Sequence, residues 1–222
     1  MYKHFFKRFF DIFCSLCVFI FLWPLFVVLC ILVRSKLGSP IFFKQDRPGK
    51  DGKLFKLIKF RSMTDEKDDN GNLLPDSKRL TRFGRWLRNS SLDEMPEAIN
   101  ILKGEMSIVG PRPLLVKDCI FFDDEIMRRQ SVKPGLTGLA QVNGRNSISW
   151  EDKFKYDLEY VDTYSFSKDF SIVFKTIGKA FVKKDGVNRE GYDTDIDYGD
   201  YLLLNKKISK QLYEDKISDL KG

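Results

Sequence analysis

The sequence has 222 residues, which is enough for one folded domain with a hydrophobic core. Its net charge is +7, of which residues 1–50 carry +6, and 20 of its residues are Phe. The remaining +1 on the body argues against a nucleic-acid partner, whereas a basic and aromatic N-terminus suits membrane lipids.

An uncharged run of 22 residues, Ile12–Val33, is long enough as a helix to cross a bilayer. Pro24 in its middle removes a helix hydrogen bond and predicts a kink. Lys and Arg flank the run on both sides, and such residues mark cytoplasmic flanks. A spanning helix and a re-entrant helix that breaks at Pro24 both remain open from the residues alone.

The body after this anchor predicts a few short strands followed mainly by helices. Two strands, Pro40–Lys44 and Lys53–Phe60, flank a Pro-Gly turn. We expect a loop over 67–76, an amphipathic helix over 79–87, a helix from about Asp93 to Lys103, a short helix over 123–131, a Gly-rich loop over 133–146, and helices over 150–160 and 168–183. The last helix carries an apolar face between lysines, so it fits a membrane interface or a core-packing helix equally well. The segment from Gly191 is polar.

Asp93-Glu94 is the first candidate for chemistry. Proline is tolerated in the first turn of a helix, so Pro96 predicts a helix start near Asp93. An aspartate there is either a simple N-cap, or an ionised carboxylate that attacks phosphorus or holds Mg²⁺. Arg88 lies five residues before the pair.

A second candidate is Arg112, which stands between two prolines in Gly110-Pro111-Arg112-Pro113. Two prolines stiffen the backbone and would present the guanidinium rigidly to a phosphate, although a structural turn explains the same pattern. Lys59 and Arg61 alternate with Phe60 at a strand end. The single histidine, His4, lies beside the anchor, so histidine catalysis is not expected.

Taken together, these motifs resemble the bacterial sugar transferase family, the monotopic phosphoglycosyl transferases, and most closely its small PglC type. The resemblance runs from about residue 3 to Gly191. It rests on Phe9-Phe10-Asp11, Lys59-Phe60-Arg61-Ser62-Met63, Ser91-Leu92-Asp93-Glu94, Leu102-Lys103-Gly104-Glu105-Met106-Ser107, Val109-Gly110-Pro111-Arg112-Pro113-Leu114 and the stretch from Lys133 to Asn146.

The resemblance implies a reaction that transfers a sugar-1-phosphate from a UDP-sugar donor to polyprenyl (undecaprenyl) phosphate and releases UMP. Asp93 would be the nucleophile that forms a covalent phosphosugar intermediate, assisted by Glu94, with Mg²⁺ near Asp93. The implied substrate-binding residues are Lys59, Arg88, Arg112, Arg145 and Asp157. Downstream glycosyltransferases are possible partners.

The resemblance also implies an α+β fold: a mostly helical, membrane-associated domain with a small β element and a re-entrant N-terminal membrane helix. Residues 1–36 would form the anchor, 37–190 a catalytic domain on the cytoplasmic face of the bacterial inner membrane, and 191–222 a polar tail. Small members commonly have Ser-Pro at the helix break, whereas this chain has Trp23-Pro24. Two alternatives stay open, namely a one-step transfer with Asp93 as a metal ligand only, and a non-catalytic membrane scaffold.

Overall fold

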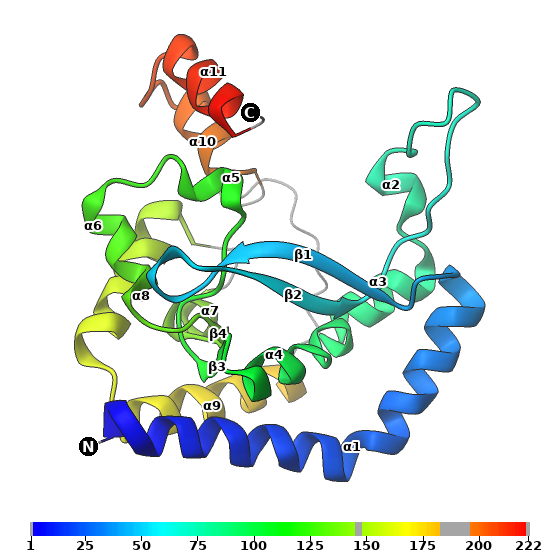
Figure 1. The fold of residues 1–222 in the computed structure, drawn as a ribbon, viewed down its shortest axis with the longest axis vertical. Coiled ribbons are helices and arrows are strands. Elements are labelled where there is room, and N and C mark those ends of the chain that lie inside the picture. The colour runs from blue at the N-terminus through cyan, green and yellow to red at the C-terminus, as the bar shows by residue number, and fades with distance from the viewer. Residues whose placement is uncertain (1, 145–147, 183–195, 221–222) are drawn as a thin grey trace.

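The computed structural model describes residues 2–144, 148–182 and 196–220, and it is mostly helical with two small two-stranded sheets. Figure 1 shows a central hairpin with helices around it and a long, bent N-terminal helix along one side. The predicted α+β class, helical with a small β element, is confirmed at this level.

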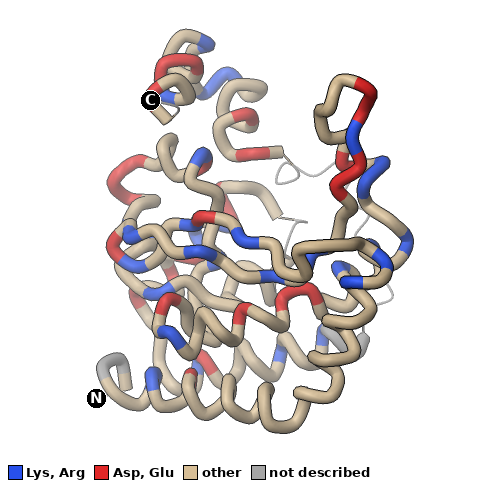
Figure 2. The backbone as a smooth tube through the Cα atoms, turned by 45° about the vertical axis from the view of Figure 1, so that its right-hand side comes forward, with Lys and Arg blue, Asp and Glu red and all other residues tan. Residues whose placement is uncertain are grey.

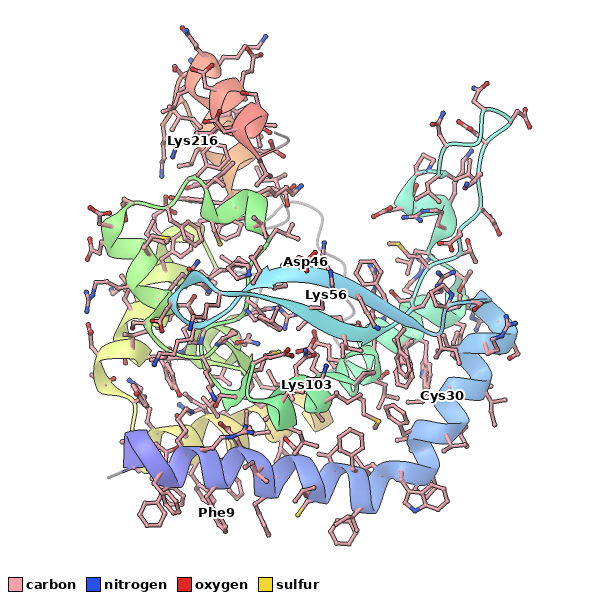
Figure 3. All side chains as sticks on the ribbon, viewed as in Figure 1. Phe9, Cys30, Asp46, Lys56, Lys103 and Lys216 are labelled. Carbon is pink, nitrogen blue, oxygen red and sulfur yellow. The ribbon has the colours of Figure 1, made fainter. Side chains whose placement is uncertain are left out.

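The N-terminal helix α1 spans Lys7–Leu37 and follows a helical turn at Tyr2–Phe6. It contains Pro24 and is the one described helix that is long and apolar enough to cross a membrane. Figure 3 places Phe9 on one arm of the bent helix and Cys30 on the other. Proline is a common cause of such a bend, because its ring removes a backbone hydrogen bond.

The first arm of α1 is fastened to the body by charged groups. The Arg8 guanidinium donates to the carbonyl oxygens of Ile101 at 2.5 Å and Leu102 at 2.7 Å. The buried Asp11 carboxylate accepts from the Ser107 hydroxyl and from the Ile108 amide, both at 2.8 Å. These bonds to charged groups fix the start of the helix on the body.

The second arm of α1 is attached to the same body by apolar packing. Leu29, Val33 and Leu37 are buried in one cluster with Phe60 and Leu87. Both ends of the apolar helix therefore contact one folded unit.

Many of the other apolar side chains along α1 are exposed. Phe9, Ile20, Phe21, Trp23 and Ile31 each keep more than half of their surface exposed. In Figure 3 the Phe9 ring points away from the body. Figure 2 shows that the charges of α1 gather near its two ends and leave its middle uncharged.

Helix α9, Phe166–Val182, runs beside the first arm of α1 (Figure 1). Its Ile172 is buried in the core, while Phe170, Phe174 and Ile177 are about half exposed. The two interpretations of this segment are therefore not exclusive, since one face packs inward and an apolar face stays open.

The hairpin pairs β1, Phe42–Pro48, with β2, Leu54–Phe60, in antiparallel register, and Arg47 lies opposite Phe55. A second sheet pairs β3, Ser107–Val109, with β4, Gly135–Thr137, in parallel. The prediction of a loop over 133–146 is wrong in part, because this stretch holds β4 and helix α7, Leu139–Asn143. Glycine permits the pairing: a Cβ on Gly135 would lie 2.1 Å from the Gly110 nitrogen.

The remaining described helices pack around the hairpin and the small sheet or stand clear of them at the edges of the molecule (Figure 1). They are α2 (Asp76–Arg79), α3 (Arg82–Asn89), α4 (Glu97–Lys103), α5 (Val116–Cys119), α6 (Asp124–Met127), α8 (Trp150–Thr163), α10 (Tyr198–Leu204) and α11 (Lys210–Asp219). A 3₁₀ turn at Arg128–Ser131 continues α6.

The C-terminal segment contributes to the core although its sequence is polar. Tyr198, Tyr201 and Leu202 of α10 are buried with Trp150 and Phe154 of α8. The tyrosine rings bury apolar surface while their hydroxyl groups remain available for hydrogen bonds.

Candidate active site

Asp93 and Glu94 lie in a 3₁₀ turn, Leu92–Glu94, between α3 and α4. The predicted helix start is displaced: α4 begins at Glu97, and Pro96 immediately precedes it. Ser91, just before the turn, has a left-handed backbone (φ 56°). Asp93 therefore does not cap a helix, and the capping interpretation is wrong.

The Asp93 carboxylate is buried but is not engaged by any hydrogen bond or ion pair within the described part of the chain. Burial raises its pKa, and the neighbouring Glu94 raises it further. Lys59, Arg112 and Arg88 oppose this shift by attraction. A buried acid without a partner, beside three cations, is a group that a ligand can engage.

Glu94 holds two of these cations. Its Oε1 atom accepts from Lys59 Nζ at 3.0 Å and from Arg112 Nη2 at 2.5 Å. Although burial opposes ionisation, these two cations hold the pKa of Glu94 well below its usual range. Glu94 is thus an anion that fixes the cations around Asp93.

Glu97 is the second acid on Lys59, with Oε1 3.1 Å from Nζ, and it is almost fully buried. Burial raises its pKa and so does the charge of Glu94, while Lys59 lowers it. Sequence reasoning missed Glu97, because an acid in the first turn of a helix is ordinary and its contact with β2 comes from tertiary packing.

Arg112 follows β3, and the buried side chain of Arg129 holds its backbone in place. Its carbonyl oxygen accepts from Arg129 Nη2 at 2.7 Å, and the same guanidinium pairs with Asp157 at 2.7 Å. The side chains of Arg129 and Asp157 are only 4% and 3% exposed, whereas that of Arg112 is 42% exposed. Asp157 therefore supports Arg112 through Arg129 and does not face open space.

Arg88 approaches from α3, where its Nε donates to the Ser62 hydroxyl at 2.8 Å. Gly84 allows this packing, because a Cβ on it would lie 1.8 Å from the Ser62 carbonyl oxygen. The structure thus brings Lys59, Arg88 and Arg112 together around Asp93 and Glu94. Arg145 lies outside the described residues, and Pro24 lies in the bent anchor.

A metal would need ligands beyond the protein at this site. The described residues contain no group of three or more His, Cys, Asp and Glu side chains placed to hold an ion. Mg²⁺ commonly takes one or two carboxylates together with substrate phosphates, and the unengaged Asp93 carboxylate fits that donor set.

Chemically, the site offers an unengaged carboxylate next to fixed cations, close to a helix that is apolar and exposed. Carboxylates act as nucleophiles in covalent catalysis, and Arg and Lys stabilise charge on a phosphoryl group. The arrangement suits a substrate that carries phosphate.

The chain also has relatives among known proteins. EpsL of Bacillus subtilis (strain 168), described as an uncharacterized sugar transferase, is 48% identical over 85% of this chain and 93% of the relative. The UDP-glucose:undecaprenyl-phosphate glucose-1-phosphate transferase of Klebsiella pneumoniae is 39% identical over 81% of this chain, and the undecaprenyl-phosphate galactose phosphotransferase of Salmonella typhimurium is 37% identical over 83%.

The chain spans only about two fifths of the length of the last two relatives, 41% and 42% respectively. The model of one family, described as bacterial sugar transferase, matches residues 2–183. This match includes the anchor, the hairpin, the Asp93-Glu94 turn and all the cations around it. The chain therefore belongs to the bacterial sugar transferase family.

Proposed function

We propose that this protein transfers a sugar-1-phosphate from a UDP-sugar to undecaprenyl phosphate and releases UMP. The observation that carries the proposal is the buried, unengaged carboxylate of Asp93 among Lys59, Arg88 and Arg112. The name of the Klebsiella pneumoniae relative states both a UDP-sugar donor and this acceptor, and the name of the Salmonella typhimurium relative states the acceptor, which supports the proposal.

In the first step, an Asp93 oxygen attacks the β-phosphorus of the donor. A bond forms between that oxygen and phosphorus, the bond from phosphorus to the bridging oxygen breaks, and UMP leaves with the electron pair. Lys59, Arg88 and Arg112 stabilise the phosphoryl charge, and Glu94 keeps two of these cations in place.

In the second step, a phosphate oxygen of the lipid attacks the same phosphorus. The bond to Asp93 breaks, the aspartate is regenerated and a lipid-linked diphosphosugar is formed. Dividing the transfer lets one soluble and one lipid substrate use the site in turn. Asp93 is the residue that would hold Mg²⁺, which supplies charge neutralisation for the diphosphate when it is bound.

The attachment of both arms of α1 to one body supports a re-entrant anchor, which enters and leaves the membrane on one face. Lys7, Arg8, Arg34 and Lys36 at its two ends suit the cytoplasmic side of the inner membrane. Trp23, which is 60% exposed next to Pro24, lies where small family members commonly have serine.

UMP release from a panel of UDP-sugars, with undecaprenyl phosphate in nanodiscs, tests the reaction and identifies the sugar. Asp93→Asn is expected to abolish release, because the amide is not a nucleophile and the isosteric change leaves the packing intact. Asp65→Asn, on an exposed loop acid paired with Arg61, is the matched control. Turnover by Asp93→Asn near the wild-type rate would contradict the nucleophilic role.

Donor without acceptor separates the two-step from the one-step reaction. We expect a mass increase equal to one sugar phosphate on the peptide that contains Asp93. If a preparation that is active with both substrates shows no such adduct, the result would favour direct transfer.

Single cysteines at positions 3 and 36 test the anchor in sealed vesicles, in a background that lacks the native cysteines. A re-entrant helix predicts labelling of both from the same side, and labelling from opposite sides would contradict it.

A further inference from the structure

Arg47, near the end of β1, is a cation without an acidic partner in the described structure. Its Nη1 donates to the Pro113 carbonyl oxygen at 3.2 Å and its Nη2 to Gln45 Oε1 at 2.7 Å. Its Nε atom is buried and has no hydrogen-bond partner there. Buried arginines are usually paired with an acid, so the charge of Arg47 lacks its ordinary compensation.

Lys153 of α8 is a second cation of this kind. Its ammonium lies 3.9 Å from the centroid of the Trp150 ring, and no ion pair or hydrogen bond to it occurs in the described residues. Burial lowers the pKa of Lys153 to about 8, and the positive charges of Arg129 and Arg112 act in the same direction. The negative charges of Asp157 and Asp118 only partly offset this lowering.

Arg112 is linked to both cations through its neighbours. Arg47 donates to the carbonyl oxygen of the next residue, Pro113, and Lys153 lies one helical turn before Asp157, whose partner Arg129 donates to the Arg112 carbonyl oxygen. The charge of Arg112 is the second cause, after burial, that lowers the pKa of Arg47 to about 10, and Asp118 and Glu97 partly offset this shift. Three cations thus share one region, where the Asp157 carboxylate is already paired with Arg129 and the Glu94 carboxylate with Lys59 and Arg112. This positive excess, partly removed from water, favours an anion that carries more than one charge.

The position of the cluster favours the soluble substrate over the lipid. Figure 1 shows the arrowhead of β1 and the start of α8 on the side of the hairpin that faces away from α9 and the first arm of α1. Most of the exposed large apolar side chains, which suit a lipid, lie on α1 and α9. We expect a water-soluble nucleotide to approach from the opposite side.

We propose that Arg47, Arg112 and Lys153 form an anion subsite that receives the diphosphate of the nucleotide donor, next to Asp93. The inference rests on the proposed function and adds Arg47 and Lys153 to it. Arg112 joins the subsite to the nucleophile because it also contacts Glu94. An arginine guanidinium can donate hydrogen bonds to two phosphate oxygens at once, and the ammonium group of Lys153 adds a point charge on α8.

The test compares full-length Arg47→Gln and Lys153→Met with wild type in nanodiscs. Losing one charge-assisted hydrogen bond is expected to raise the KM for the UDP-sugar about tenfold or more, with the KM for undecaprenyl phosphate unchanged within about twofold. Inhibition by UMP should weaken in parallel. Arg47→Lys should recover part of the loss.

Lys44→Gln on the same strand and Lys155→Met on the same helix are matched controls, because both side chains are exposed. They are expected to leave both KM values unchanged. Equal increases in the two KM values, or a fall in kcat alone, would overturn the donor subsite.

Binding of inorganic pyrophosphate, followed by calorimetry, separates this proposal from the proposed reaction. Weaker pyrophosphate binding by both variants would support the subsite, whether or not the wild type transfers sugar phosphate. A wild type that transfers no sugar phosphate would count against the proposed reaction and not against the subsite. Unchanged pyrophosphate binding in both variants would refute the subsite.

Discussion

Asp157→Asn is expected to destabilise the protein strongly, because it leaves the buried Arg129 guanidinium without its charged partner. Arg129 and Asp157 are 4% and 3% exposed and 2.7 Å apart, and Arg129 Nε also donates to the same carboxylate oxygen at 3.0 Å. Removing one partner of a buried ion pair typically destabilises by about 3–5 kcal/mol. At about 2–4 °C per kcal/mol for a chain of this size, Tm should fall by about 6–20 °C.

The double variant Arg129→Met/Asp157→Leu separates charge from packing. Replacing both ions by apolar groups is often neutral for stability, so most of the lost Tm should return. Activity should remain low, since the Arg112 carbonyl has lost its Arg129 donor. Asp162→Asn on the same helix is the control: its pair with Arg128 is half exposed, so we expect a loss of about 0–1 kcal/mol.

Thermal unfolding in nanodiscs, followed by intrinsic fluorescence, and UMP release measure the two effects. A Tm drop below about 2 °C in Asp157→Asn would show that Arg129 is compensated in another way. A double variant as unstable as the single one would show that shape, rather than an uncompensated charge, causes the loss.

Three further predictions concern the anchor, the Arg88 support and the donor subsite. Asp11→Asn weakens two charge-assisted hydrogen bonds that fasten α1 and should lower the stability by about 1–3 kcal/mol, measured as a lower Tm; an unchanged Tm would refute it. Gly84→Ala places a methyl group 1.8 Å from the Ser62 carbonyl oxygen, so α3 must shift and UMP release should fall at least severalfold. Gly178→Ala is the control and should have little effect, because nothing lies within 4 Å of the added methyl group. Because Lys153 is cationic only below its pKa of about 8, kcat/KM for the donor should decline as pH rises through 8, and Lys153→Arg should remove that decline; a decline that persists in this variant would assign it to another group.

Much of the fold follows from local patterns in the sequence. Two strand-like stretches around a Pro-Gly turn predicted β1 and β2, although β1 continues to Pro48, four residues beyond the predicted end at Lys44. Apolar spacing predicted α8 and α9 with small errors at their ends. The pairing of β3 with β4 could not be predicted, because strands of three residues are too short to carry a period and their contact joins Ser107 to Gly135. The buried rings of α10 were missed because tyrosines among acidic residues give the segment a polar mean hydropathy.

The candidate site was predictable in its residue types but not in its contacts. Motifs placed Asp93, Lys59 and Arg112 at one centre, and the structure adds that Glu94 binds both cations and leaves Asp93 unengaged. Glu97, Arg47 and Arg129 act through side chains from distant parts of the chain, and no local pattern distinguishes them from surface charges. The lack of an acidic partner for Arg47 among the described residues is visible only once its neighbours are placed.

The double attachment of α1 also has a mechanical consequence. A helix joined to its body at one end lets that body swing freely above a bilayer, whereas attachments at Asp11 and at Val33 remove that rotation. In the proposed re-entrant anchor, the depth of the apolar helix in the bilayer would set the height of Asp93 above the lipid headgroups. Bilayer thickness and headgroup packing would then govern how readily a lipid phosphate reaches the carboxylate, so membrane composition would tune the rate of the proposed second step.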